Sequence, residues 1–225
     1  MSAILKYEKN DPTLPRDYLK LKSSYHKVQL QRAAPKDESI QLDPKKYLLS
    51  KTDPRGNIEY CNSYFVKISG YSEKELVGKP HSIVRHPDMP SAVYELMWEH
   101  LHRRKNIYML MKNMAKDGRY YWVGAEFNIK VNKAIDELQG YFAYQKPAPA
   151  HALPHIEAFY QKLKAIEEES GTEASYKYLQ GFLEERHQSW NEYMDDLVNT
   201  SFAKKLSNLR RKLFSSEPDE LILVS

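Results

Sequence analysis

Two turn signals separated by a helix-rich stretch place the tightest limits on how this chain can fold. The first is Asp53–Asn57, in which proline fixes φ and glycine supplies a positive φ. Short β-compatible segments, Tyr47–Thr52 and Ile58–Cys61, flank this turn and predict a hairpin. The second signal is Lys116–Arg119, which separates two further β-compatible segments. The chain is therefore predicted to form antiparallel strands both before and after the helices.

The stretch between the two hairpins predicts several short helices. Asn62 can cap a helical segment that runs to Ile68, and Gly70 stops it. Ser72–Glu75 has the capping-box pattern and opens a second helix, which ends at Gly78–Pro80. A broad apolar face at helical spacing predicts a longer helix over Ser91–Arg104.

Three more strands are predicted after these helices, at Ile107–Met114, Tyr120–Val131 and Leu138–Gln145. The order of two strands, short helices and three strands predicts an α+β domain. We expect a five-stranded antiparallel sheet with short helices on one face.

Segments on both sides of this domain extend the chain. We divide it into a partly helical N-terminal extension (1–40), the central domain (41–146), a linker (147–151), a helical output or interaction region (152–216) and a tail (217–225). Apolar residues recur at heptad-like steps in the helical region, which is interrupted at Ser170–Thr172. This stripe is either a dimer seam or partner-docking face, or it packs on the domain's own sheet.

The composition excludes several classes of protein. The chain has 34 basic and 30 acidic residues, a net charge of +4 that does not indicate nucleic-acid binding. It has no glycine-rich phosphate loop and a single cysteine, Cys61, so no internal disulfide is possible. We expect a cytoplasmic protein without membrane insertion, because neither a signal-peptide core nor an apolar run of about 18 residues is present.

The run Arg85–Pro90 (Arg-His-Pro-Asp-Met-Pro) carries the main candidate site residues. The planar guanidinium of Arg85 suits a phosphate, and Asp88 can accept from an amide or a ribose hydroxyl. The alternative is an Arg85–Asp88 ion pair that braces the loop before the long helix. His86 is not predicted to be a catalytic base, because no nucleophile or second acid accompanies it.

The chain resembles a PAS domain, and more narrowly the FAD-binding PAS domain of bacterial aerotaxis receptors. The matching blocks are Asn62 with Phe65, Ile68–Tyr71, Glu75–Leu76, Gly78–His81, Ile83–Pro90, Met97–Trp98, Lys112–Asn113, Asp117–Gly118 and Tyr121–Val123. The resemblance implies non-covalently bound FAD, whose redox state is converted into a conformational signal. It also implies that six residues bind the flavin or support its pocket: Asn62, Arg85, His86, Asp88, Trp98 and Asn113.

Two positions depart from the pattern of that family. The family has Pro-Trp and then a small residue before the block at Lys112–Asn113, whereas this chain has Ile107 and Met109. A stacking aromatic is missing at Ile107, and Met109 adds bulk. The rival hypothesis is therefore an apo PAS interaction module whose pocket these side chains fill.

Other interpretations of single residues stay open beside the family resemblance. Asn62 is also a plausible helix cap, Asn113 can satisfy strand-end backbone, and Trp122 suits a core position better than a pocket wall. Haem would need an axial ligand, for which His81, His86 and His100 are candidates. A joint metal site at His100 and His102 is disfavoured, because they lie on different helix faces.

The sequence thus predicts a non-enzymatic sensor of redox or energy state. We expect it to relay its signal to a partner, such as a chemoreceptor signalling protein or a kinase, with a homodimer left open. His187 lacks the neighbourhood of a phosphoacceptor histidine, and no ATP-binding glycine boxes follow it.

Overall fold

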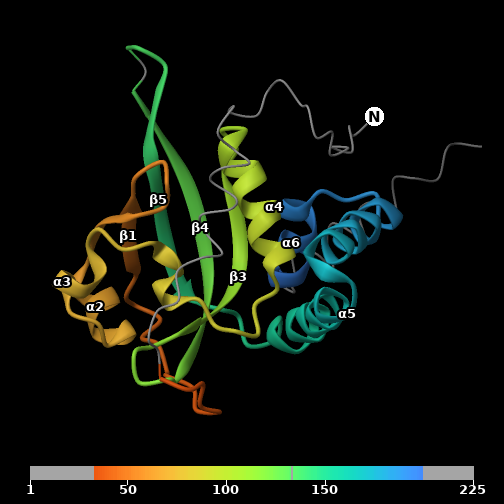
Figure 1. The fold of residues 1–225 in the computed structure, drawn as a ribbon, viewed down its shortest axis with the longest axis horizontal. Coiled ribbons are helices and arrows are strands. Elements are labelled where there is room, and N and C mark those ends of the chain that lie inside the picture. The colour runs from red at the N-terminus through yellow and green to blue at the C-terminus, as the bar shows by residue number, and fades with distance from the viewer. Residues whose placement is uncertain (1–32, 133, 200–225) are drawn as a thin grey trace, which may run out of the picture.

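The computed structural model describes residues 33–132 and 134–199, and it contains one five-stranded antiparallel sheet (Figure 1). The strand order is β2-β1-β5-β4-β3, so the first and last strands in sequence meet at the centre. The strands are β1 (Leu48–Thr52), β2 (Ile58–Cys61), β3 (Ile107–Met114), β4 (Tyr120–Asn132) and β5 (Glu137–Pro147). The predicted fold class is confirmed.

Short helices connect β2 to β3. They are α2 (Ser63–Ser69), α3 (Glu73–Leu76), the 3-10 helix η1 (His81–Val84) and α4 (Ser91–His102). Asn62 caps α2 by accepting a hydrogen bond from the backbone N–H of Phe65, and Gly70 ends α2 at φ 71°. The predicted capping box of Ser72 and Glu75 is present at α3.

The main core lies between the sheet and these helices. Alternate residues of a strand point to opposite faces, and the side chains of Leu48, Tyr121, Val123 and Ala125 are completely buried. Val93 and Leu101 of α4 are buried in the same core. The helices therefore form one layer over the inner face of the sheet.

A C-terminal helical hairpin completes the described fold. It comprises α5 (Leu153–Glu185) and is followed by α6 (Trp190–Val198). The predicted break is confirmed, because Gly171 has φ 86° and ψ 168° inside α5. The two halves of α5 fold back on each other: the rings of Phe159 and Phe182 have centroids 4.2 Å apart, and Ser175 Oγ donates to the carbonyl of Leu163 at 2.8 Å.

This hairpin and α6 cover the outer edge of the sheet at β3, beside α4 (Figure 1). Trp190 Nε1 donates to the carbonyl of Tyr108 at 2.9 Å, and the Tyr160 hydroxyl donates to the carbonyl of Leu110 at 2.8 Å. The backbone N–H of Tyr108 donates to Asn191 Oδ1 at 3.2 Å. Side chains of α5 and α6 thus satisfy the backbone groups that an edge strand would otherwise expose.

Most of the described part of the C-terminal apolar stripe is buried within the chain itself, while Ile166, Leu183 and Leu197 are partly buried. Its buried members are Ile156, Phe159, Leu163, Leu179, Trp190 and Met194. These six residues pack inside the chain and do not form an exposed dimer seam. Their helices lie against α4 and the edge strand β3, however, and not on a face of the sheet, where the intramolecular alternative placed them. Three predicted segments lie outside the described residues: the rest of the stripe (Phe202, Leu206, Leu209 and Leu213), the helical part expected in the N-terminal extension (Tyr18–Arg32) and the tail. None of the described helices is both long enough and apolar enough to cross a bilayer.

Candidate functional site

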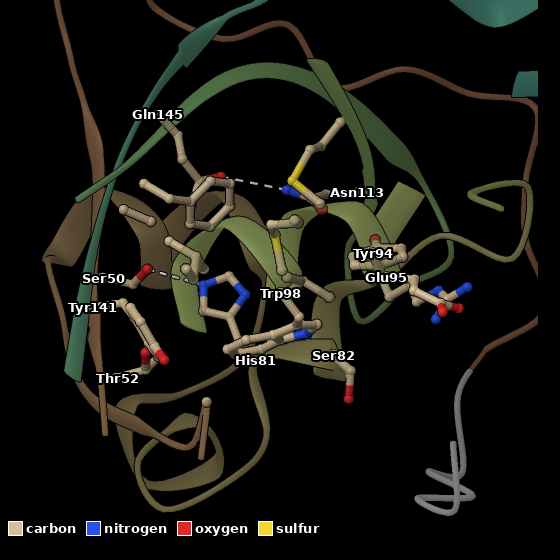
Figure 2. A pocket seen from close by; sticks show the side chains of 18 of the residues that line it. Ser50, Thr52, His81, Ser82, Tyr94, Glu95, Trp98, Asn113, Tyr141 and Gln145 are labelled. Carbon is tan, nitrogen blue, oxygen red and sulfur yellow. Dashed lines mark hydrogen bonds between the residues drawn. The ribbon is translucent and has the colours of Figure 1, made fainter. Parts of the chain in front are cut away.

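A pocket lies between the inner face of the sheet and the helices η1 and α4 (Figure 2). It holds a cavity of about 100 Å³. The strands β1, β3, β4 and β5 form one wall, and η1, the loop after it and α4 form the other. The lining residues are Ser50, Thr52, Gly56, His81, Ser82, Val84, Arg85, Ser91, Tyr94, Glu95, Met97, Trp98, Leu101, His102, Met111, Asn113, Phe127, Tyr141, Ala143 and Gln145.

Two buried amides face each other on the sheet wall (Figure 2). Asn113 of β3 is 4% exposed and Gln145 of β5 is 1% exposed, and Asn113 Nδ2 donates to Gln145 Oε1 at 3.4 Å. Gln145 Nε2 has no hydrogen-bond partner within residues 33–132 and 134–199. A buried donor left in this state is costly, and this nitrogen is able to donate to any group in the pocket that accepts a hydrogen bond.

A second buried donor lies on the same strand. Tyr141 and Gln145 are four residues apart on β5 and therefore point to the same face. The Tyr141 hydroxyl is buried and, among the described residues, also has no hydrogen-bond partner. Burial raises the pKa of Tyr141 far above its ordinary value, so the hydroxyl stays protonated and can donate.

The opposite side of the pocket carries aromatic and imidazole rings. The Trp98 ring stacks on His102 at 5.5 Å and meets the ring of Tyr141 edge-on at 5.5 Å. His81 Nε2 lies 2.9 Å from the hydroxyl of Ser50, and its ring meets that of Phe65 edge-on. Burial lowers the pKa of both His81 and His102 to about 4, so both imidazoles are neutral near pH 7.

The depressed pKa of His81 predicts a loss of stability in acid. Its folded-state pKa of about 4 lies below the ordinary value of 6.5, so its contribution is complete above pH 6.5 and is lost as the pH falls toward 4. Between pH 7 and pH 5 we expect the free energy of unfolding to fall by about 2 kcal/mol through this residue. Urea denaturation at the two pH values measures the difference.

The matched variants for this pH dependence are His81→Gln and His155→Gln. Replacing His81 should remove about 2 kcal/mol of the difference between pH 7 and pH 5 and leave the share of His102, whose pKa is also lowered to about 4, whereas replacing His155, which is exposed, should leave the whole difference intact. An unchanged pH dependence in His81→Gln would show that His81 is not held neutral by burial.

The structure brings three of the six predicted site residues to the pocket, namely Arg85, Trp98 and Asn113. Arg85 and Asn113 also form an isolated antiparallel bridge, which holds the loop after η1 against β3. Arg85 Nη2 donates to the carbonyl of Met89 and to Ser91 Oγ, each at 3.0 Å, and its guanidinium lies over the ring of Tyr94.

The other three predicted residues lie outside the pocket lining. The Asn62 side chain is hydrogen-bonded to the backbone: Oδ1 accepts from the N–H groups of Leu49 and Phe65, and Nδ2 donates to the carbonyl of Tyr47. His86 is buried, with its Nδ1 near the backbone N–H of Asp88. The Asp88 side chain is 60% exposed and pairs with Lys112 Nζ at 2.6 Å.

Other candidates from the sequence also fall outside the lining. Trp122 stacks on Tyr160 of α5. His100 Nδ1 lies 2.9 Å from the carbonyl of Leu96 in its own helix. Ile107 and Met109 are fully buried in the core and are not among the residues that line the cavity. The described residues contain no cluster of three or more side chains suited to a metal ion.

Sequence reasoning missed Gln145 and Tyr141, and it considered His81 only as a possible haem ligand and His102 only in a disfavoured metal pair, so neither histidine was assigned to this pocket. One signal for the first two was available, because Tyr141, Ala143 and Gln145 alternate along the predicted last strand and must share a face. A glutamine on the apolar face of a strand is unusual, since polar side chains on buried faces need partners.

Comparison with known proteins agrees with this architecture. A family model described as the PAS fold matches residues 58–141. The five-stranded antiparallel sheet and its short helices agree with the PAS fold that this match indicates. Residues 58–141 therefore lie in a region with the PAS fold, to which the C-terminal hairpin is added.

The sequence resemblance to aerotaxis receptors is also confirmed. The chain is 36% identical over 118 residues to the aerotaxis receptor of Escherichia coli K12, covering 52% of this chain and 23% of the receptor. It is 32% identical over 98 residues to a nitrogen fixation regulatory protein of Klebsiella pneumoniae, covering 44% and 20% of the two chains. It is 34% identical over 77 residues to the biofilm dispersion protein BdlA of Pseudomonas aeruginosa, covering 34% and 18%. The matched part spans less than a quarter of the length of each relative.

Proposed function

We propose that this chain senses redox or energy state through FAD bound in the PAS pocket. The observation that carries the proposal is the buried amide nitrogen of Gln145, beside Asn113, which has no hydrogen-bond partner in the part of the chain that the structure describes. The similarity to an aerotaxis receptor supports the same choice of ligand. The protein acts without enzymatic chemistry of its own and passes its signal in the cytoplasm to a partner, such as a chemoreceptor signalling protein or a kinase.

The donors and rings of the pocket suit a flavin ring. The isoalloxazine system is planar and carries carbonyl and ring-nitrogen acceptors along one edge. Gln145 Nε2 and the Tyr141 hydroxyl supply donors for that edge, and Trp98 supplies an aromatic wall. Val84, Met97, Leu101 and Met111 supply apolar contacts.

The size of the cavity requires side chains to move on binding. A cavity of about 100 Å³ is smaller than the ~300–1,000 Å³ of most ligand pockets. Met97 and Met111 both line the pocket and have flexible, unbranched side chains. Their rearrangement, together with that of Trp98, is the expected route to a larger pocket.

The chain's own residues would turn a change at the ligand into a change in the sheet. When bound, flavin would supply reversible redox chemistry. The Gln145 amide has both donor and acceptor groups, so it can pair with a ligand atom that accepts or with one that donates. Gln145 is paired along β5 with both β1 and β4, so its reorientation acts at the centre of the sheet.

Replacement of Trp98 tests the assigned pocket. Trp98→Ala should weaken FAD binding about tenfold, because it removes an aromatic wall worth about 1–3 kcal/mol in base stacking. Trp122→Ala is the matched control, since Trp122 stacks on Tyr160 outside the pocket. FAD titrations followed by flavin fluorescence measure both affinities, and an equal affinity in wild type and Trp98→Ala would refute the pocket assignment.

The small cavity also favours a second candidate function. An apo PAS module would use the domain for protein contacts alone, and a cavity of about 100 Å³ would then remain a packing defect. The two functions differ in one measurable respect, because only the first requires specific binding of FAD to the folded protein.

A further inference from the structure

A carboxylate from the C-terminal hairpin caps the long helix of the PAS domain. The helix α4 begins at Ser91, and the preceding residue, Pro90, has no side chain able to cap it. Glu167 of α5 takes this role: the backbone N–H of Ser91 donates to Glu167 Oε2 at 2.6 Å, and Ser91 Oγ donates to Glu167 Oε1 at 2.7 Å. A carboxylate at this position also complements the helix dipole.

The same serine is hydrogen-bonded to the pocket wall. Arg85 Nη2 donates to Ser91 Oγ at 3.0 Å, and both residues line the cavity. The hydroxyl of Ser91 therefore accepts from Arg85 and donates to Glu167. This continuous path leads from the pocket through two charge-assisted hydrogen bonds into α5.

A second link joins the same loop to α5. Lys112 Nζ contacts the carboxylate of Asp88 at 2.6 Å and that of Glu157 at 3.7 Å. The loop between η1 and α4 is thus linked to Glu157 of α5 through Lys112, and the first residue of α4 is linked to Glu167 of α5. The Glu167 link is the shorter and the more buried, since its side chain is 12% exposed and that of Glu157 is 43% exposed.

We infer that Glu167 is a positioning residue that couples Arg85 in the pocket wall to the docking of the C-terminal hairpin. A ligand that draws the guanidinium toward itself removes the donor from Ser91 Oγ and changes the cap that Glu167 provides. The identity of that ligand rests on the proposed function, whereas the coupling itself is a property of the unliganded chain. The output signal would then be a change in the stability of the packing of α5 against α4.

Amide hydrogen exchange of residues 153–170 in the full chain tests the coupling without any ligand. Arg85→Met and Glu167→Gln should each speed exchange in this segment about tenfold, because each removes one charged partner of Ser91. The double variant should exchange no faster than the faster single variant, since both changes break the same path. Glu169→Gln, an exposed position on the same helix, should match wild type.

If Glu167 only capped α4, without coupling to the pocket, the exchange rates would differ from this expectation. In that case Glu167→Gln alone would speed amide exchange in residues 153–170, and Arg85→Met would leave their exchange rates at the wild-type values. Ser91→Ala provides a second variant that keeps the backbone cap and removes only the bridging hydroxyl. It should abolish the dependence of α5 exchange on Arg85, and a dependence that persists in Ser91→Ala would overturn the inference.

Adding FAD separates this inference from the proposed function. If FAD binds, it should change exchange in residues 153–170 of wild type at least threefold and leave Glu167→Gln unchanged at equal occupancy. An equal response of both proteins would contradict the coupling. If FAD does not bind, the proposed function fails, and the ligand-free comparison of Arg85, Ser91 and Glu167 variants still decides the coupling.

Discussion

Replacing Trp190 by alanine should lower the free energy of unfolding by about 4 kcal/mol. The side chain is 1% exposed, and truncation of a buried tryptophan typically costs about 3–5 kcal/mol. The change also removes the donor to the carbonyl of Tyr108, on the edge strand β3. Urea denaturation followed by circular dichroism measures the loss.

The loss at Trp190 should have a second consequence. With α6 detached, the edge of β3 is uncovered, and we expect concentration-dependent association of the variant. Tyr178→Ala is the control, because Tyr178 lies in the neighbouring helix α5 but is 41% exposed. If both variants unfolded at the wild-type urea concentration, α6 would not be part of the cooperative fold described above.

Replacing Gln145 by leucine should weaken binding of FAD by about 30- to 100-fold and leave the stability of the unliganded protein nearly unchanged. Leucine removes a buried amide nitrogen that has no hydrogen-bond partner among the described residues, but it also removes the acceptor of the buried Asn113 Nδ2. These two effects on the free energy of unfolding have opposite signs and similar sizes, so we expect a net change below about 1 kcal/mol. Binding weakens because the acceptor on the ligand loses its donor in a dry site.

A large loss of binding without a loss of stability marks a residue kept for its ligand. Denaturation of the unliganded protein and fluorescence titration with FAD measure the two effects separately. Tyr144→Leu is the matched control, because the neighbouring side chain points to the exposed face of the sheet. A loss of stability in Gln145→Leu, with FAD affinity unchanged, would mean that Gln145 serves the core and not a ligand.

Most of the PAS domain follows from local signals in the sequence. Both hairpin turns, the cap at Asn62 and the capping box at Ser72 are decided by residues a few positions apart, and the structure has all of them. The helix η1 was not predicted, because four residues after Pro80 carry no helical period. Strand order is likewise set by packing over long sequence separations.

The pocket was harder to predict, because the type of a residue does not specify whether its side chain points into the cavity or away from it. Arg85, His86 and Asp88 are close in sequence, yet only Arg85 lines the cavity, while Asp88 turns outward to Lys112. Gln145 was not predicted to be a site residue. Its place in the pocket depends on the pairing of β5 with β4, which brings its side-chain oxygen within 3.4 Å of Asn113 Nδ2. The bond between Glu167 and Ser91 spans 76 residues and has no local signature.

The absorbance spectrum of the purified full chain, before and after incubation with excess FAD and gel filtration, tests the central claim most directly. We predict flavin bands at about 370 and 450 nm that co-elute with the folded protein at close to one flavin per chain. A folded protein that stays colourless after incubation with FAD would contradict the account and leave the apo interaction module in its place.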